Sequence, residues 1–216
     1  MERIIKIFIA DDHPIVRKGL IEILQEQKNI QCVGQAENGL DALEQIINLE
    51  PDLAILDIDM PMMNGLDVAK KAISKNLFTR FVILTMHREE GFYNEAMDIG
   101  VRGYLLKDAV LNDLVDCIHA VQNGGSYISP TLHQFLEKRE TKQLESDWAR
   151  KYQLTLSELN VLKLVGQGKT TKEIAEILFV SKKTIETHRG NCVKKLGLEG
   201  SKNALIKFLL ENHGMA

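Results

Sequence analysis

Apolar runs and amphipathic stretches alternate regularly through about residue 124. Short apolar runs predict strands at about 4–10, 30–36, 52–57, 81–86 and 103–106. After each run the apolar spacing lengthens to that of a helix, at about 14–27, 39–49, 65–75, 90–99 and 111–123. Five strand–helix repeats in this order predict an α/β unit with a doubly wound, five-stranded parallel sheet.

This rhythm stops at residues 125–129 and Pro130. Residues 131–151 are polar and charged, with only scattered apolar side chains, and we expect a linker there with one or two helical turns. From Leu154 the apolar spacing is purely helical. The pattern predicts a first domain at 1–125, a linker at 126–151 and an all-α domain at 152–216.

Capping signals divide the last domain into helices. The motifs Thr155-x-x-Glu158 and Thr170-x-x-Glu173 are capping boxes that open two helices. Ser181 is suited to cap a third helix, which runs to about residue 196, and a fourth covers about 202–210. Two capped helices joined by a short turn are typical of a helix-turn-helix.

Charge divides the chain in the same way. Residues 1–129 carry 12 Lys and Arg against 20 Asp and Glu, whereas residues 130–216 carry 15 against 10. A basic second half favours nucleic acid as its partner, although many basic faces are only solvated. No apolar run reaches the length of a membrane span and no cleavable signal pattern is present, so we expect a cytoplasmic protein without a membrane partner. The three cysteines have no metal-binding spacing and are expected to be reduced thiols.

Polar side chains follow the predicted strands at their carboxyl ends: Asp11 and Asp12, Asp57 and Asp59, Thr85, and Lys107. The carboxyl ends of parallel strands meet at one edge of the sheet, so these groups should converge. Clustered carboxylates repel and favour a hard divalent cation, Mg²⁺ above all. A carboxylate shielded in this way can attack a phosphoryl donor, and a hydroxyl and an ammonium can bind the new oxygens. Each residue alone has an ordinary structural explanation, such as an aspartate that caps a helix.

Residues 4–124 resemble the receiver domain of two-component response regulators, which has a flavodoxin-like fold. The matching motifs are Ala10-Asp11-Asp12-His13, Leu56-Asp57-Ile58-Asp59-Met60-Pro61 with Gly65, Leu84-Thr85 and Tyr104-Leu105-Leu106-Lys107. The resemblance implies that Asp57 is the phosphoacceptor. It also implies that Asp12 and Asp57 hold Mg²⁺, with help from the Asp59 backbone carbonyl and from Asp11 through water.

The same resemblance implies roles for the switch residues. Thr85 and Lys107 would bind the phosphoryl oxygens, and Tyr104 would turn inward when Thr85 moves toward them. His87, two residues after the threonine, is either a loop histidine or a group that shields the acyl phosphate or positions water. Asp108 stands where many receivers have a proline after the lysine.

The third helix of the last domain has two faces. Ile185, His188, Cys192 and Leu196 form one stripe that should pack inward. The opposite face is polar and carries Lys182, Lys183, Glu186, Thr187, Gly190 and Lys194. A DNA major groove accepts such a face, with lysines on phosphates and short or polar side chains on base edges. An ordinary solvated helix has the same pattern.

Residues 154–198 resemble the helix-turn-helix of LuxR-type regulators of the NarL subfamily. The matching motifs are Leu154-Thr155-x-x-Glu158, Gly166-x-Gly168, Lys172-Glu173-Ile174-Ala175, Leu178, Val180-Ser181-x-x-Thr184-Ile185-x-x-His188 and Lys195-Leu196-Gly197. The resemblance implies that Glu186, Thr187 and Gly190 face bases. With Lys182, Lys183, Thr184 and Lys194 they complete the expected DNA-binding set.

Together the two resemblances imply a transcriptional response regulator. A sensor histidine kinase would phosphorylate Asp57, and phosphorylation would control dimerisation and binding to double-stranded promoter DNA. The protein would not be an enzyme, beyond slow autodephosphorylation. The last helix, with Leu205, Phe208 and Leu209, is a candidate dimer contact or simply packs on its own bundle.

Three other interpretations are weaker. A haloacid-dehalogenase-like phosphatase shares an Asp-x-Asp motif, but it expects Thr or Val where Pro61 stands and places the motif on an N-terminal strand. A binding module with a vestigial acidic pocket is a second interpretation. Nucleotide binding is disfavoured because no glycine-rich loop follows the first strand.

Overall fold

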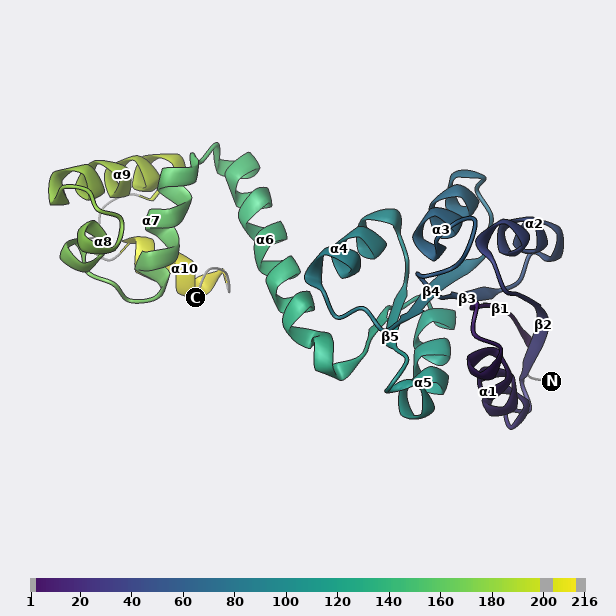
Figure 1. The fold of residues 1–216 in the computed structure, drawn as a ribbon. Helices are drawn as coiled ribbons and strands as arrows, with labels where there is room; N and C mark the ends of the chain where they lie inside the picture. Colours follow the sequence, from purple (N-terminus) through teal and green to yellow (C-terminus); the bar gives the residue numbers. More distant parts are fainter. Residues whose placement is uncertain (1–2, 199–203, 213–216) are drawn as a thin grey trace. The chain divides into compact units, whose positions relative to one another are not determined.

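The computed structural model describes residues 3–198 and 204–212 (Figure 1). The chain forms two compact units, Met1–Leu136 and Glu137–Ala216, and each is described separately below.

The first unit is built on a parallel sheet in the order β2-β1-β3-β4-β5-β6. Its strands are β1 (Ile5–Ala10), β2 (Ile30–Ala36), β3 (Leu53–Leu56), β4 (Arg80–Thr85), β5 (Gly103–Leu106) and β6 (Tyr127–Ile128). The five predicted strands are confirmed. β6 was not predicted because a two-residue strand is too short to show a periodic pattern.

Helices cover both faces of this sheet (Figure 1). They are α1 (Pro14–Gln25), α2 (Gly39–Leu49), α3 (Gly65–Ser74), α4 (Glu90–Ile99) and α5 (Val110–Gln122). α1 and α5 pack on one face, and α2, α3 and α4 pack on the other. Local sequence explains where several begin: Pro14 occupies the first turn of α1, and Asn38 and Asn64 accept backbone N–H bonds as the caps of α2 and α3. β3 is buried along its whole length, as a central parallel strand requires.

The segment that follows β6 contains one long helix, so the prediction of one or two helical turns was wrong. A short 3₁₀ helix, Pro130–Leu132, leads into α6, which spans 20 residues from His133 to Tyr152. α6 consists largely of good helix formers but has no apolar stripe along its length, which is why the pattern did not indicate it. Its aromatic side chains lie near its ends: Phe135 packs in the core of the first unit, and Trp148 and Tyr152 pack in that of the second.

The second unit contains the rest of the helices. They are α7 (Leu156–Gly166), α8 (Thr171–Ile177), α9 (Lys182–Lys195) and α10 (Ala204–Glu211). Both predicted capping boxes are present, and Ser181 caps α9. On the inward stripe of α9, Ile185, Cys192 and Leu196 are buried. The start predicted for the last helix, at residue 202, lies outside the described residues.

Candidate functional site

Asp57 lies directly after β3, at the carboxyl edge of the sheet. Asp57 is 2% exposed, and its backbone N–H donates to the carbonyl oxygen of Ala10 over 2.8 Å. Gly65, the first residue of α3, lies against it: a Cβ at Gly65 would be 2.0 Å from the Asp57 carbonyl oxygen. Glycine is therefore needed for α3 to begin this close to the aspartate.

Lys107, just after β5, joins two of the predicted carboxylates. Its Nζ lies 2.8 Å from Asp57 Oδ2 and 2.7 Å from Asp11 Oδ2. Burial raises the pKa of Asp57, although the hydrogen bond and charge of Lys107 oppose that shift. Burial alone would lower the pKa of Lys107, but the hydrogen bonds and charges of Asp11 and Asp57 outweigh it and raise the pKa. The ammonium therefore stays charged between the two carboxylates.

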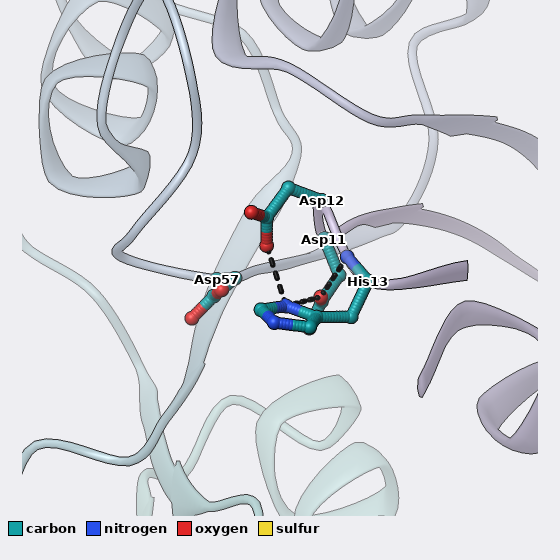
Figure 2. A group of neighbouring side chains, drawn as sticks. All are labelled: Asp11, Asp12, His13 and Asp57. Carbon is teal, nitrogen blue, oxygen red and sulfur yellow. Dashed lines mark hydrogen bonds and ion pairs between the residues drawn. The ribbon is translucent and has the colours of Figure 1, made fainter. Parts of the chain in front are cut away.

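A compact group of possible metal ligands includes Asp57, with Asp11, Asp12 and His13 on one side of it (Figure 2). One ligand atom each from Asp11, Asp12, His13 and Asp57 lies within 4.8 Å of the others. His13 Nδ1 lies 2.6 Å from Asp12 Oδ1 and 3.3 Å from Asp11 Oδ1. Asp12 Oδ1 and Asp11 Oδ2 are both buried; the first lies beside His13 Nδ1 and the second beside Lys107 Nζ. Buried carboxylate oxygens in this state fit a hard divalent cation.

Asp59 does not contribute its side chain to this group. Its carboxylate is largely exposed, and Oδ2 lies 2.8 Å from His87 Nε2. His87 also lies 3.4 Å from Glu89 through Nδ1, and its ring packs on Phe92 with the centroids 4.3 Å apart. The predicted role of Asp59 uses its backbone carbonyl, which these contacts leave untested. His87 is held in place by these contacts beside the carboxyl edge.

Thr85 and Tyr104 are both buried and meet at the backbone of His87. Thr85 Oγ1 accepts the His87 N–H over 3.1 Å, and the Tyr104 hydroxyl donates to the His87 carbonyl over 3.3 Å. The Thr85 carbonyl also accepts the Lys107 N–H over 2.9 Å. Burial raises the pKa of Tyr104 well above its ordinary value, so the hydroxyl stays a donor. Tyr104 is thus buried, with its hydroxyl held on the His87 loop, and its predicted role as a switch stays a prediction.

Tyr104 is the first ring of an aromatic row that the sequence pattern does not indicate. Its ring meets Tyr93 of α4 edge-on with centroids 5.7 Å apart, and Tyr93 lies 6.1 Å from Phe135 of α6. Ser129 forms a second connection between β5 and the residues before α6. Its N–H donates to the Tyr104 carbonyl over 3.0 Å, and its Oγ accepts the Leu106 N–H and donates to Asp113. Singly, such residues have no sequence signature that distinguishes them from ordinary core.

The polar face of α9 is exposed at every position predicted on it: Lys182, Lys183, Glu186, Thr187, Gly190 and Lys194. Thr184 differs, because its N–H donates to Ser181 Oγ over 3.1 Å and its hydroxyl lies 2.8 Å from the same oxygen. Thr184 thus belongs to the cap of the helix. A Cβ at Gly190 would meet no atom within 4 Å, so packing does not require glycine there. Its small size leaves room for another molecule to approach the backbone.

In the second unit, Leu205 and Leu209 of α10 are buried and Phe208 packs on Trp148 and Tyr152. Packing on its own bundle therefore accounts for these three side chains, which are also the candidate dimer contact. Ile206 and Leu210 of the same helix are exposed. None of the described helices is long and apolar enough to cross a membrane.

A parallel α/β unit with carboxylates and a lysine at its carboxyl edge, followed by a capped helix-turn-helix, defines a DNA-binding response regulator. Comparison with known families agrees for both parts. Residues 7–119 match the response regulator receiver domain, and residues 152–208 match the luxR family of bacterial regulatory proteins. The chain belongs to the response regulators whose DNA-binding domain is of the luxR family.

Its relatives are similar over almost the whole chain. The transcriptional regulatory protein YhcZ of Bacillus subtilis (strain 168), described as uncharacterized, is 38% identical over 88% of this chain and 89% of its own length. The oxygen regulatory protein NreC of Staphylococcus carnosus (strain TM300) is 34% identical over 95% of this chain and 97% of its own. A structure of the response regulator RcsB in complex with DNA is 26% identical, with a TM-score of 0.59, over 96% of this chain and 98% of that one.

Proposed function

We propose that Asp57 accepts a phosphoryl group from a sensor histidine kinase and that this event controls the DNA binding of α9. The observation that carries the proposal is the position of Lys107 Nζ, within 2.8 Å of both Asp57 and Asp11. An ammonium at this point neutralises charge on the attacking carboxylate and can then bind a phosphoryl oxygen. Thr85, whose hydroxyl is buried nearby, supplies the second donor after a small shift.

The chemistry is a simple displacement. An Asp57 carboxylate oxygen attacks the phosphorus of a phosphohistidine, an O–P bond forms, and the N–P bond breaks with its electron pair leaving on the imidazole. The product is an aspartyl phosphate. Loss of the phosphoryl group to water is slow in this proposal.

Mg²⁺ is the proposed cofactor, held by Asp11, Asp12 and Asp57 with the Asp59 carbonyl. Three carboxylates and the Lys107 ammonium give the site a net charge of minus two, which one divalent cation neutralises. When bound, the cation would reduce the repulsion between the attacking carboxylate and an anionic donor. His13 lies at the same cluster, and its contact with Asp12 would have to loosen for that oxygen to become a ligand.

For the response, we propose that α9 lies in the DNA major groove. Lys182, Lys183 and Lys194 would contact phosphates, and Glu186, Thr187 and Gly190 would face base edges. The partner is double-stranded promoter DNA, bound by a homodimer; Ile206 and Leu210 of α10 are the exposed apolar side chains suited to pair two copies. Lys182→Ala should weaken binding to all sequences and lower its salt dependence.

The functional division that we propose is a receiver at 1–125, a linker at 126–151 and a DNA-binding domain at 152–216, in a cytoplasmic protein. The route from site to linker is the aromatic row Tyr104–Tyr93–Phe135 together with Ser129. These contacts connect β5, which ends beside Lys107, with the first turn of α6. A shift of Thr85 and the His87 loop would therefore disturb the packing of Phe135.

The deciding experiment is phosphorylation of the full chain by a small-molecule phosphodonor, followed by intact-mass measurement. The wild type should gain one phosphoryl group in the presence of Mg²⁺ and lose that capacity when the cation is chelated. Asp57→Asn should gain none. Asp59→Asn is the matched control, because its carboxylate is exposed and outside the cluster, and it should still be phosphorylated. A wild type that stays unmodified would instead favour a binding module with a vestigial pocket.

A further inference from the structure

Phe179, in the turn between α8 and α9, is an aromatic residue placed almost entirely in solvent. Its exposed fraction is 94%, and its backbone φ is +55°. Hydrogen bonds of the turn fix its backbone, including the Val180 N–H to the Ala175 carbonyl over 3.0 Å. Bulky residues rarely adopt positive φ, where Gly or Asn is favoured, so this position costs folding stability.

Burial does not offset that cost. A side chain so exposed contributes little to the core, and a large exposed apolar group beside other apolar groups marks a contact surface. Val180, 41% exposed, lies next to it in the chain. Both side chains border an open pocket of about 440 Å³ whose other lining residues are Lys172, Ala175, Glu176 and Lys182.

Lys182 connects this pocket to the DNA-binding face, because it is the first residue of α9 and one of the predicted phosphate contacts. We propose that Phe179 packs against the deoxyribose rings of the DNA backbone beside the groove that α9 enters. Lys172 and Lys182, which line the same pocket, would bind the flanking phosphates. The Phe179 contact is apolar and independent of sequence. It sets how deeply the first turn of α9 lies in the groove.

This inference rests on the proposed binding of DNA through α9. The test measures affinity of the phosphodonor-treated full chain for a random-sequence duplex by fluorescence anisotropy, at several salt concentrations. Phe179→Ala should bind about five- to tenfold more weakly at every salt concentration. The slope of log affinity against log salt concentration should not change, because an apolar contact releases no counterions. Phe179→Leu should lose less DNA affinity than Phe179→Ala. Lys182→Ala should lower the slope.

Phe179→Gly separates contact from folding. Relief of the positive φ should raise the unfolding temperature, while DNA binding falls as in Phe179→Ala. Leu156→Ala is the matched control: this side chain is 81% exposed in the same unit, at the start of α7. It lies near the opposite end of α9, where Lys195 Nζ reaches Glu158 over 2.7 Å. The DNA affinity of Leu156→Ala should equal that of the wild type.

The outcomes separate the Phe179 contact from the proposed DNA binding on which it rests. Phe179→Ala with wild-type affinity, while Lys182→Ala still weakens binding, would overturn the Phe179 contact and assign the pocket to another partner. Weaker binding by Phe179→Ala together with a lower unfolding temperature would also overturn it, because Phe179 would then act through the fold. Absence of salt-dependent DNA binding by the wild type would instead refute the function on which the inference rests.

Discussion

Glu158 should contribute to the stability of the helical unit through its charge, beyond its role as a helix cap. Its carboxylate accepts the Thr155 N–H over 2.8 Å and lies 2.7 Å from Lys195 Nζ, with the side chain 3% exposed. Burial would raise the pKa of Glu158, but the hydrogen bonds of Lys195 and Thr155 outweigh it and lower the pKa. Glu158→Gln keeps an oxygen for the cap and removes only the charge.

The loss of stability expected for Glu158→Gln follows from the contacts of Glu158 with Lys195 and Thr155. A hydrogen bond to a charged group contributes about 1.5–3 kcal/mol, but Lys195 is 33% exposed and solvent screens part of the attraction. We therefore expect Glu158→Gln to cost about 1–2 kcal/mol at pH 7, or a fall of about 5–15 °C in unfolding temperature for a unit of this size. The contribution is present above the unfolded pKa of glutamate and is lost as pH falls through the lower folded pKa. The two proteins should therefore converge in acid.

Trp148 gives the assay, because it is the sole tryptophan of the chain and packs on Phe208 in this unit, with ring centroids 5.4 Å apart. Its fluorescence during heating reports the unfolding of the helical unit within the full chain. Glu173→Gln is the matched control, because Glu173 makes the same capping-box bonds at the surface of α8. The fall in unfolding temperature of Glu173→Gln should therefore be much smaller. Equal shifts for the two variants, or a difference that persists below the folded pKa of Glu158, would refute the reasoning.

Three further changes test the first unit. Gly65→Ala should destabilise it by about 1–3 kcal/mol and slow phosphorylation, since a Cβ there meets the Asp57 carbonyl at 2.0 Å; unchanged urea unfolding and kinetics would contradict this. His87→Ala removes the partner of Asp59 beside the site and should change the rate at which the phosphorylated protein loses its phosphoryl group; identical decay rates would remove His87 from the chemistry. Phe135→Leu should leave the phosphorylation rate unchanged but reduce the gain in DNA affinity that phosphorylation produces; a full gain would exclude the aromatic row as the route.

How far the fold follows from sequence depends on whether a segment buries a regular pattern. β3 is apolar and buried along its whole length, and Asn64 and Thr155 cap helices with their own side chains, so local signals and the final structure agree. β6 is held by pairing with β5, a long-range contact without a local pattern. α6 has its aromatic side chains near its ends and an exposed Leu144 between them, so its length depends on helix propensity, which predicts structure only weakly.

The same distinction applies to the site. Asp57, Lys107 and the other predicted site residues are polar residues at the ends of apolar strands. Each of them alone has an ordinary structural explanation, but sequence alone indicates them as a group at one edge of the sheet. The groups that could carry the signal onward are Tyr93, Ser129 and Phe135, whose residue types are those of any well-packed core. These residues matter through the particular neighbours that they contact, and only the three-dimensional structure shows which neighbours those are. Substitutions that spare phosphorylation and alter the DNA response should therefore be found among core residues near β5, away from the carboxylates.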